Sequence, residues 1–208
     1  MEQEWMPFII SIKTALTATM ITFFLGIFAA NKINKINPKH KGILDSLFTL
    51  PMVLPPTVIG FFLLVILGRN GFIGKLLYSI GINVIFSWGA TVIAAVVVSF
   101  PLMYSTAKGA FEQIDKNILN AAQTMGVSNF KIFWKIMIPL AWPGIAAGTI
   151  LSFARALGEF GATLMIAGNI PGKTQTIPLA IYFAAEGGDI QGALTWVYTI
   201  FGISLFTM

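Results

Sequence analysis

Long apolar runs separated by short polar segments dominate the pattern of this chain. A helix of about 20 apolar residues is long enough to cross the roughly 30 Å hydrocarbon layer of a bilayer. Five runs come near or exceed this length, at about residues 8–30, 47–67, 84–106, 136–166 and 193–208. We therefore predict an all-α integral membrane protein with five spans, organised as a single domain over residues 1–208.

Three of the runs depart from a simple span. The second contains Pro51, Pro55 and Pro56, which break or kink a helix because proline has no backbone N–H to donate. The fourth is long for one crossing, which predicts a tilted helix or a re-entrant start. The last is short and reaches Met208 without a polar stop. Either the fifth span is truncated, which we favour, or a short fifth helix ends in the membrane interface.

Composition supports a membrane location, because 56% of the residues are hydrophobic and only 10% are charged, against about a quarter charged in globular proteins. The net charge of +5 would by itself admit nucleic acid as a partner. The distribution of the charges favours a different explanation. The loops after the first and third runs hold four basic residues each: Lys32, Lys35, Lys39, Lys41, Lys108, Lys116, Lys131 and Lys135.

The opposite side of the predicted bundle holds three basic residues, Arg69, Lys75 and Lys173. Basic residues collect in cytoplasmic loops of membrane proteins, so the lysine-rich loops are expected in the cytoplasm and the N-terminus outside. The acidic start of the chain lacks the basic region of a secretory signal. The sequence has no cysteine and a single histidine, His40, in a lysine-rich loop, and it predicts no metal site, cofactor or catalytic group.

The predicted cytoplasmic segment, about residues 107–135, has an internal pattern of its own. Apolar residues recur at the spacing of one helix face, at Ile114, Ile118, Ala121, Ala122 and Met125. Gly126 follows where a helix end favours positive φ, and Ser128 is suited to cap the start of a second helix. Pro139 then interrupts the hydrogen-bond ladder. This pattern predicts helix, tight turn, helix; an amphipathic helix resting on lipid headgroups is the alternative.

The spacing of this segment resembles a known motif. Asn120-Ala-Ala-x3-Gly126-x9-Ile136-x-Ile138-Pro139 resembles the EAA loop of ABC importer permeases at seven positions, with Asn120 in place of Glu and Ile138 in place of Leu. The resemblance implies a type I importer permease bundle whose loop docks on a separate ATPase subunit. The docking residues it implies are Asn120, Ala121, Ala122, Met125, Gly126 and Val127.

The resemblance extends over most of the chain. The stretches LPMVLPPTVIGFFLL, LGRNGFIGKLLY and RALGEFGATLMIAGNIPGKTQTIPLAIY are similar to bacterial molybdate permease subunits. The family implies a homodimer in the bacterial cell membrane, in contact with lipid, with two ATPase copies and an extracytoplasmic molybdate-binding protein. Sulfate and tungstate remain alternative substrates. Two alternatives belong to other classes: a stand-alone secondary transporter and a membrane scaffold. A secondary transporter needs charged coupling residues inside the spans, and few are present.

The candidate pathway or gate residues lie in the second and fourth runs: Pro55, Pro56, Ser152, Arg155 and Glu159. Arg155 and Glu159 are four residues apart on one helix face, so they either form an ion pair that orders the bundle or border the anion pathway. Gly144 and Gly148 form a GxxxG pattern compatible with a dimer interface.

The stretch AGNIPGKT, residues 167–174, resembles a phosphate-binding loop but has Ala167 where that pattern needs glycine. Such a loop works between a strand and the N-terminus of a helix, whereas this stretch follows a predicted membrane helix. We therefore expect a rigid external turn here, with ATP bound by another chain.

Overall fold

The computed structural model describes residues 5–34 and 36–207. These residues form eleven α-helices and one π-helical turn, with no strand among them, as an all-α fold requires. Residues 1–4 of the N-terminal tail, Lys35 of the basic loop and Met208 at the end of the last run lie outside the described residues.

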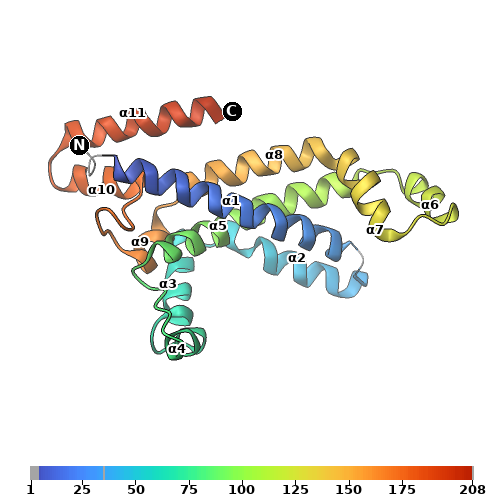
Figure 1. The fold of residues 1–208 in the computed structure, drawn as a ribbon, viewed down its shortest axis with the longest axis horizontal. Helices are drawn as coiled ribbons and strands as arrows, with labels where there is room; N and C mark the ends of the chain where they lie inside the picture. Colours follow the sequence, from blue (N-terminus) through green and yellow to red (C-terminus); the bar gives the residue numbers. More distant parts are fainter. Residues whose placement is uncertain (1–4, 35, 208) are drawn as a thin grey trace.

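Three long helices form the body of the molecule: α1 (Met6–Ile33), α5 (Trp88–Glu112) and α8 (Ile138–Leu157). They run side by side along the long axis, and α5 contacts α1, α8, α2 (Pro38–Val53) and α9 (Gly161–Ala167) (Figure 1). Helix α5 contributes to all three buried apolar clusters of the described chain. It extends beyond the expected end of the third run, into the segment assigned to the cytoplasmic loop.

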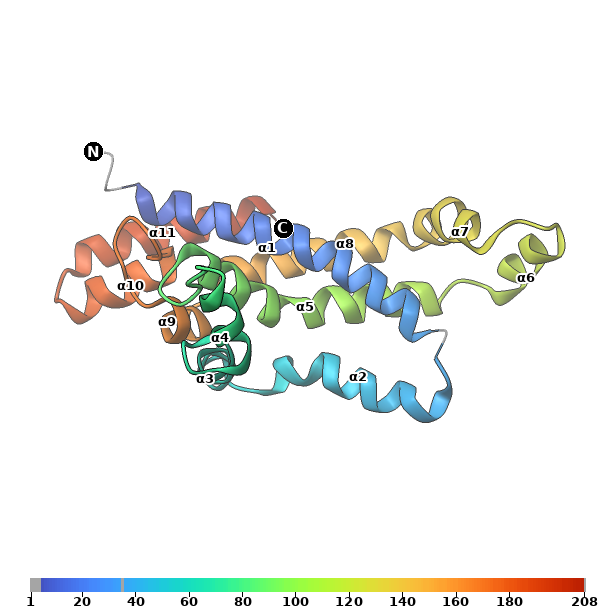
Figure 2. The ribbon, with the colours of Figure 1, turned by 60° about the horizontal axis from the view of Figure 1, so that its bottom comes forward.

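The second run is not one helix. It consists of α2 (Pro38–Val53) and α3 (Pro56–Leu67), which are bent by 112° at the break. Pro51 lies inside α2, and Pro55 and Pro56 begin α3; since neither of these two can donate a backbone hydrogen bond, the ladder of α2 stops before them. The prediction that the prolines break this run is confirmed. Helix α2 follows α5, while α3 turns away from it (Figure 2).

The fourth run, residues 136–166, is not one continuous helix. A π-helical turn, Phe133–Met137, comes first, and Pro139 lies in the opening turn of α8. The wider turn accommodates the proline ring, which would otherwise press on the carbonyl four residues earlier. The break lies at the far end instead, where residues 158–160 separate α8 from α9 (Gly161–Ala167).

The remaining helices are α4 (Phe72–Ser79), α10 (Ile177–Glu186) and α11 (Ile190–Thr207). Helix α10 is tied to α1 by a buried hydrogen bond of 2.7 Å from the Ile177 N–H to the Ser11 Oγ. Helix α11 contacts α8, and its Ile200 and Ile203 pack against the buried cluster that includes Ala156 and Leu157.

Three helical stretches in the described chain are long and apolar enough to cross a bilayer alone, Met6–Ile33, Trp88–Glu112 and Asn129–Leu157. The bent pair of α2 and α3 makes a fourth if it counts as one span, and α11 is a shorter apolar helix. Five spans therefore stay a prediction.

Helices α5 and α8 approach each other at the two glycines of the GxxxG pattern. A Cβ placed on Gly144 would lie 2.6 Å from the Ala110 Cβ, and one on Gly148 would lie 3.2 Å from the Met103 Sδ and closer still to Thr106. Real Cβ atoms do not approach other atoms as closely as 2.6 Å. The pattern thus serves packing within this chain, and its interpretation as a dimer contact is not supported.

We predict that Gly148→Ala destabilises the permease, because the added methyl forces α8 away from α5. Overpacking of this kind costs about 1–3 kcal/mol. Gly109→Ala is the matched control, since nothing lies within 4 Å of its added Cβ and alanine favours a helix over glycine. Thermal unfolding in mild detergent should show a lower midpoint for Gly148→Ala only. Equal midpoints for both variants would contradict the role assigned to Gly148.

Candidate functional site

A helix–turn–helix projects from one end of the molecule, formed by α6 (Lys116–Thr124) and α7 (Asn129–Ile132) (Figure 1). The Asp115 carboxylate begins α6 by accepting a hydrogen bond of 2.8 Å from the Asn117 N–H. Gly126 has φ +75°, in the left-handed region that favours glycine. Its N–H donates to the Gln123 carbonyl, and the Val127 N–H donates to that of Ala122. These two bonds form a Schellman motif, so the predicted turn is confirmed.

Only some of the apolar residues in and around α6 are buried. Ala122 is buried, but Met125 and Ile118 keep 75% and 45% of their surface exposed, and Asn120 and Ala121 are also exposed. Helix α6 lies beyond the ends of α1 and α8 (Figure 2), where only its inner side meets other helices. Five of the six residues assigned to docking therefore lie wholly or partly at the surface of one helix end, around the glycine turn.

Ser128 takes the position that begins α7, but its hydroxyl makes no capping hydrogen bond. The backbone alone continues the helix there, through a bond of 2.9 Å from the Ile132 N–H to the Ser128 carbonyl. The predicted side-chain cap is thus wrong, although the helix start is correct.

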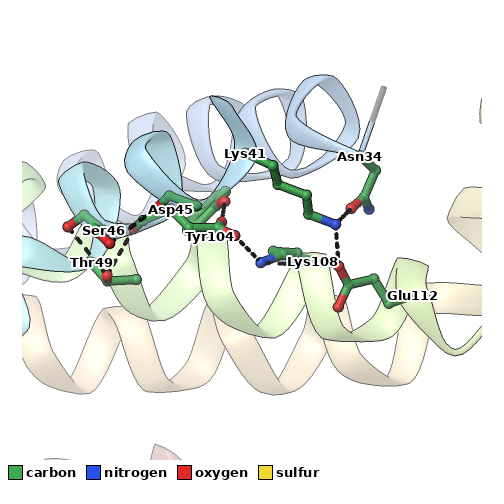
Figure 3. Close-up of polar contacts among 9 residues, drawn as sticks. Asn34, Lys41, Asp45, Ser46, Thr49, Tyr104, Lys108 and Glu112 are labelled. Carbon is green, nitrogen blue, oxygen red and sulfur yellow. Dashed lines mark hydrogen bonds and ion pairs between the residues drawn. The ribbon is translucent and has the colours of Figure 1, made fainter. Parts of the chain in front are cut away.

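A polar network holds α2 against the end of α5 that leads into α6 (Figure 3). The Lys41 Nζ lies 2.8 Å from the Glu112 Oε1, and the Lys108 Nζ contacts the Asp45 carboxylate. The Tyr104 hydroxyl donates to the same carboxylate. Each ion pair is partly exposed and so contributes about 1 kcal/mol or less; together they fix how α2 lies on α5.

Sequence reasoning missed this network because it counted Lys41 and Lys108 only as loop charges. The usable signal was spacing. Tyr104, Lys108 and Glu112 recur every four residues on α5, and Lys41 and Asp45 are four apart on α2, so each set lines one helix face.

The two helix breaks lie together. A Cβ on Gly161 would be 3.1 Å from the Pro56 Cβ and 3.2 Å from the Thr57 N, and one on Gly60 would be 2.8 Å from the Ala162 Cα. The start of α3 therefore packs closely on the start of α9. Irregular backbone inside a membrane protein is tolerated where other helices or a cavity satisfy it, and in transporters such breaks border substrate sites.

Arg155 and Glu159 form an ion pair at this joint. The Arg155 Nη1 lies 2.7 Å from the Glu159 Oε2, in contact distance but not in hydrogen-bond alignment. The other carboxylate oxygen accepts a hydrogen bond of 2.8 Å from the Ala162 N–H. The Glu159 side chain is only 2% exposed, while that of Arg155 is 31% exposed. The glutamate thus fastens the end of α8 to the start of α9.

The other candidate pathway residues lie in different surroundings. Ser152 is fully buried between α8 and α5, where its hydroxyl donates to the Ser99 carbonyl at 3.4 Å. Pro55 is exposed at the α2–α3 break. The structure therefore brings Pro56 and Glu159 to the joint, and it places Ser152 in the helix contact.

The stretch at residues 167–174 is a turn between α9 and α10. The Thr174 hydroxyl donates to the Gly168 carbonyl and accepts from the Ile170 N–H, and Gly168 and Gly172 have positive φ. A helix precedes this turn, and the next helix begins only at Ile177. A phosphate-binding loop instead follows a strand and leads directly into a helix.

Comparison with known families matches residues 22–208 to the family described as the binding-protein-dependent transport system inner membrane component. The chain belongs to this family. It is 48% identical over 203 residues to the putative molybdenum transport system permease protein YvgM of Bacillus subtilis strain 168, covering 97% of this chain and 89% of that relative. It is 43% identical over 202 residues to the molybdenum transport system permease protein ModB of Escherichia coli K12, covering 96% and 88%.

The probable sulfate transport system permease protein cysT of Chlorokybus atmophyticus is 36% identical, over 97% of this chain and 70% of that relative. The fold is similar to a chain of the inward-facing MetNI methionine ABC transporter, with TM-score 0.70 and 13% identity over 99% of this chain and 89% of that one. A bacterial ABC transporter for alginate import gives TM-score 0.72 and 18% identity, over 97% and 77%.

The resemblance read from the EAA-like spacing is confirmed at the level of the family. The permease is a multi-pass inner-membrane component of an ABC import system.

We predict that Gly126→Val abolishes ATP-driven uptake while the permease still inserts. No atom lies within 4 Å of a Cβ at Gly126, so the substitution acts on the backbone alone, and a β-branched residue resists positive φ. Gly126→Asn is the matched control, because asparagine adopts this conformation more readily. Uptake in membrane vesicles should be lost for valine and largely kept for asparagine; normal uptake by the valine variant would remove the turn from the mechanism.

We predict that Glu159→Gln lowers the unfolding midpoint, because the amide oxygen still accepts from the Ala162 N–H but Arg155 loses its counter-charge. The loss should be about 1–3 kcal/mol. Glu159→Ala should cost more, since both the ion pair with Arg155 and the hydrogen bond from the Ala162 N–H disappear. The double variant Arg155→Gln with Glu159→Gln should recover part of the loss. Additive effects in this double-mutant cycle would show that the pair is not coupled.

Proposed function

We propose that this permease translocates molybdate into the cytoplasm, powered by a separate ATPase and supplied by an extracytoplasmic binding protein. The names of its relatives support molybdate. In this proposal five spans place the N-terminus outside and α6 and α7 in the cytoplasm, two copies of the permease form the pathway, and each copy binds one ATPase. The observation that carries the proposal is the exposed, glycine-capped end of α6.

The chemistry of that helix end suits a protein partner. Met125 and Ile118 present flexible apolar side chains, and methionine adapts to the shape of an opposing groove. Ala121 adds little bulk, so another surface can approach the backbone closely. Asn120 carries no charge, and any electrostatic contribution to docking must come from neighbours such as Asp115 or Lys116.

The connections of α6 give a route for transmission. Helix α5 leads into it through residues 113–115, and α7 continues through the π-helical turn into α8. Since α5 and α8 are in close contact at Gly144 and Gly148, a displacement of α6 and α7 acts on both helices together. The joint at Pro56 and Gly161, where two helices are already broken, is the place where the bundle can change shape during alternating access.

The charges of the predicted spans are suited to weak binding of an anion. Lys13, Arg155 and Glu159 are the charged residues within these runs, and Glu159 is paired with Arg155. A deep binding site would trap a dianion inside the pathway, so selectivity is expected to lie mainly in the binding protein. Sulfate is the second candidate, because a sulfate permease is also among the relatives; tungstate is the third.

The test is uptake into proteoliposomes that contain the permease and its ATPase, with the binding protein outside. We expect molybdate uptake that requires ATP and the binding protein, and an ATPase that co-purifies with the permease. Parallel assays with tungstate and sulfate rank the substrates. Uptake that follows an ion gradient in the absence of any bound ATPase would overturn the importer and favour a secondary transporter.

A further inference from the structure

An apolar groove lies between α1 and the stretch formed by the π-helical turn and the start of α8. It is distinct from the helix–turn–helix of α6 and α7, which we call the coupling segment, and from the helix joint. It has a volume of about 430 Å³ and is walled by aromatic and aliphatic side chains, among them Phe24, Phe28, Trp134, Ile138 and Trp142. The four aromatic residues named here each keep at least half of their surface exposed. The groove therefore offers an exposed apolar surface between two helices, of a kind that hydrocarbon chains cover.

Three lysines lie at one end of this groove. Lys32 follows Phe28 by four residues on α1, and its Nζ lies 5.4 Å from the centre of the Phe28 ring. Lys131 lies in α7 and Lys135 in the π-helical turn, each exposed and three residues before Trp134 and Ile138 along the chain. Long lysine side chains extend their ammonium groups toward the membrane surface while their stems cover apolar groups.

These three lysines have no carboxylate partner among the described residues, in contrast to Lys41 and Lys108 of the polar network. The groove therefore combines an apolar body with unneutralised positive charge at one end. A ligand that fits both needs a long hydrocarbon part joined to a negative head. Basic pockets between helices at the cytoplasmic side of membrane proteins bind anionic lipid headgroups in this way.

We propose that the groove is a binding site for an anionic phospholipid, with an acyl chain against Trp134 and Trp142 and the phosphate near Lys32, Lys131 and Lys135. A second copy of this chain is a poorer occupant, since it would have to bring negative charge to the lysines. Occupation of the groove braces α1 against the π-helical turn that joins α7 to α8, and so makes the position of the coupling segment sensitive to lipid composition.

Tryptophan quenching by brominated lipids tests the proposal on the full-length permease in phosphatidylcholine nanodiscs. Brominated phosphatidylglycerol should reach half-maximal quenching at about tenfold lower mole fraction than brominated phosphatidylcholine, given the attraction of several lysines for an anionic head. Replacing Trp134 and Trp142 with phenylalanine should remove the stronger quenching by phosphatidylglycerol. High salt should weaken the preference in the unaltered protein, independently of any variant.

The variant Lys32→Gln/Lys131→Gln/Lys135→Gln should quench equally with both lipids. Lys75→Gln/Lys173→Gln, which removes charge from α4 and from the turn between α9 and α10, away from this groove, is the matched control and should keep the preference. Equal quenching of the unaltered protein by both lipids would overturn the proposal, as would a preference that survives the triple variant or disappears in the control. Quenching that does not change when Trp134 and Trp142 are replaced would also overturn it, because protein would then cover the groove.

Discussion

Gly144 and Gly148 let α8 approach α5 more closely than any residue with a Cβ would allow. In a bilayer, helices gain little from the hydrophobic effect when they associate, so close van der Waals contact between small residues is the main attraction. Helix α5 takes part in every buried apolar cluster of the described chain. The arrangement of α1, α2 and α9 therefore depends on where the α5–α8 contact places α5.

Because this contact holds α5 and α8 together, it also determines where the segments attached to their ends lie. Helices α6 and α7 connect the end of α5 to the start of α8. Next to this connection, the Lys41–Glu112 and Asp45–Lys108 pairs fix α2 to α5. At the opposite end of α8 the Glu159 carboxylate fastens α9. A rigid central pair with irregular joints at both ends can transmit a displacement across the membrane without repacking its core.

Local rules predicted part of this structure well. The positive φ of Gly126 and the break at the prolines followed from backbone chemistry that depends on few neighbours. The end of α8 did not, because it depends on which other helices lie nearby. Local rules also could not identify the helix that packs on the GxxxG face. The pattern indicates that some helix approaches closely, but it does not say which one.

The central claim is that the exposed end of α6 binds the ATPase. A photo-crosslinking amino acid at Met125 in the assembled transporter tests it most directly, with the same group at Phe72 of α4, which is 92% exposed on a different part of the molecule. The account predicts a crosslink to the ATPase from position 125 and none from position 72. Absence of that crosslink from 125, or equal crosslinking from both positions, would contradict it.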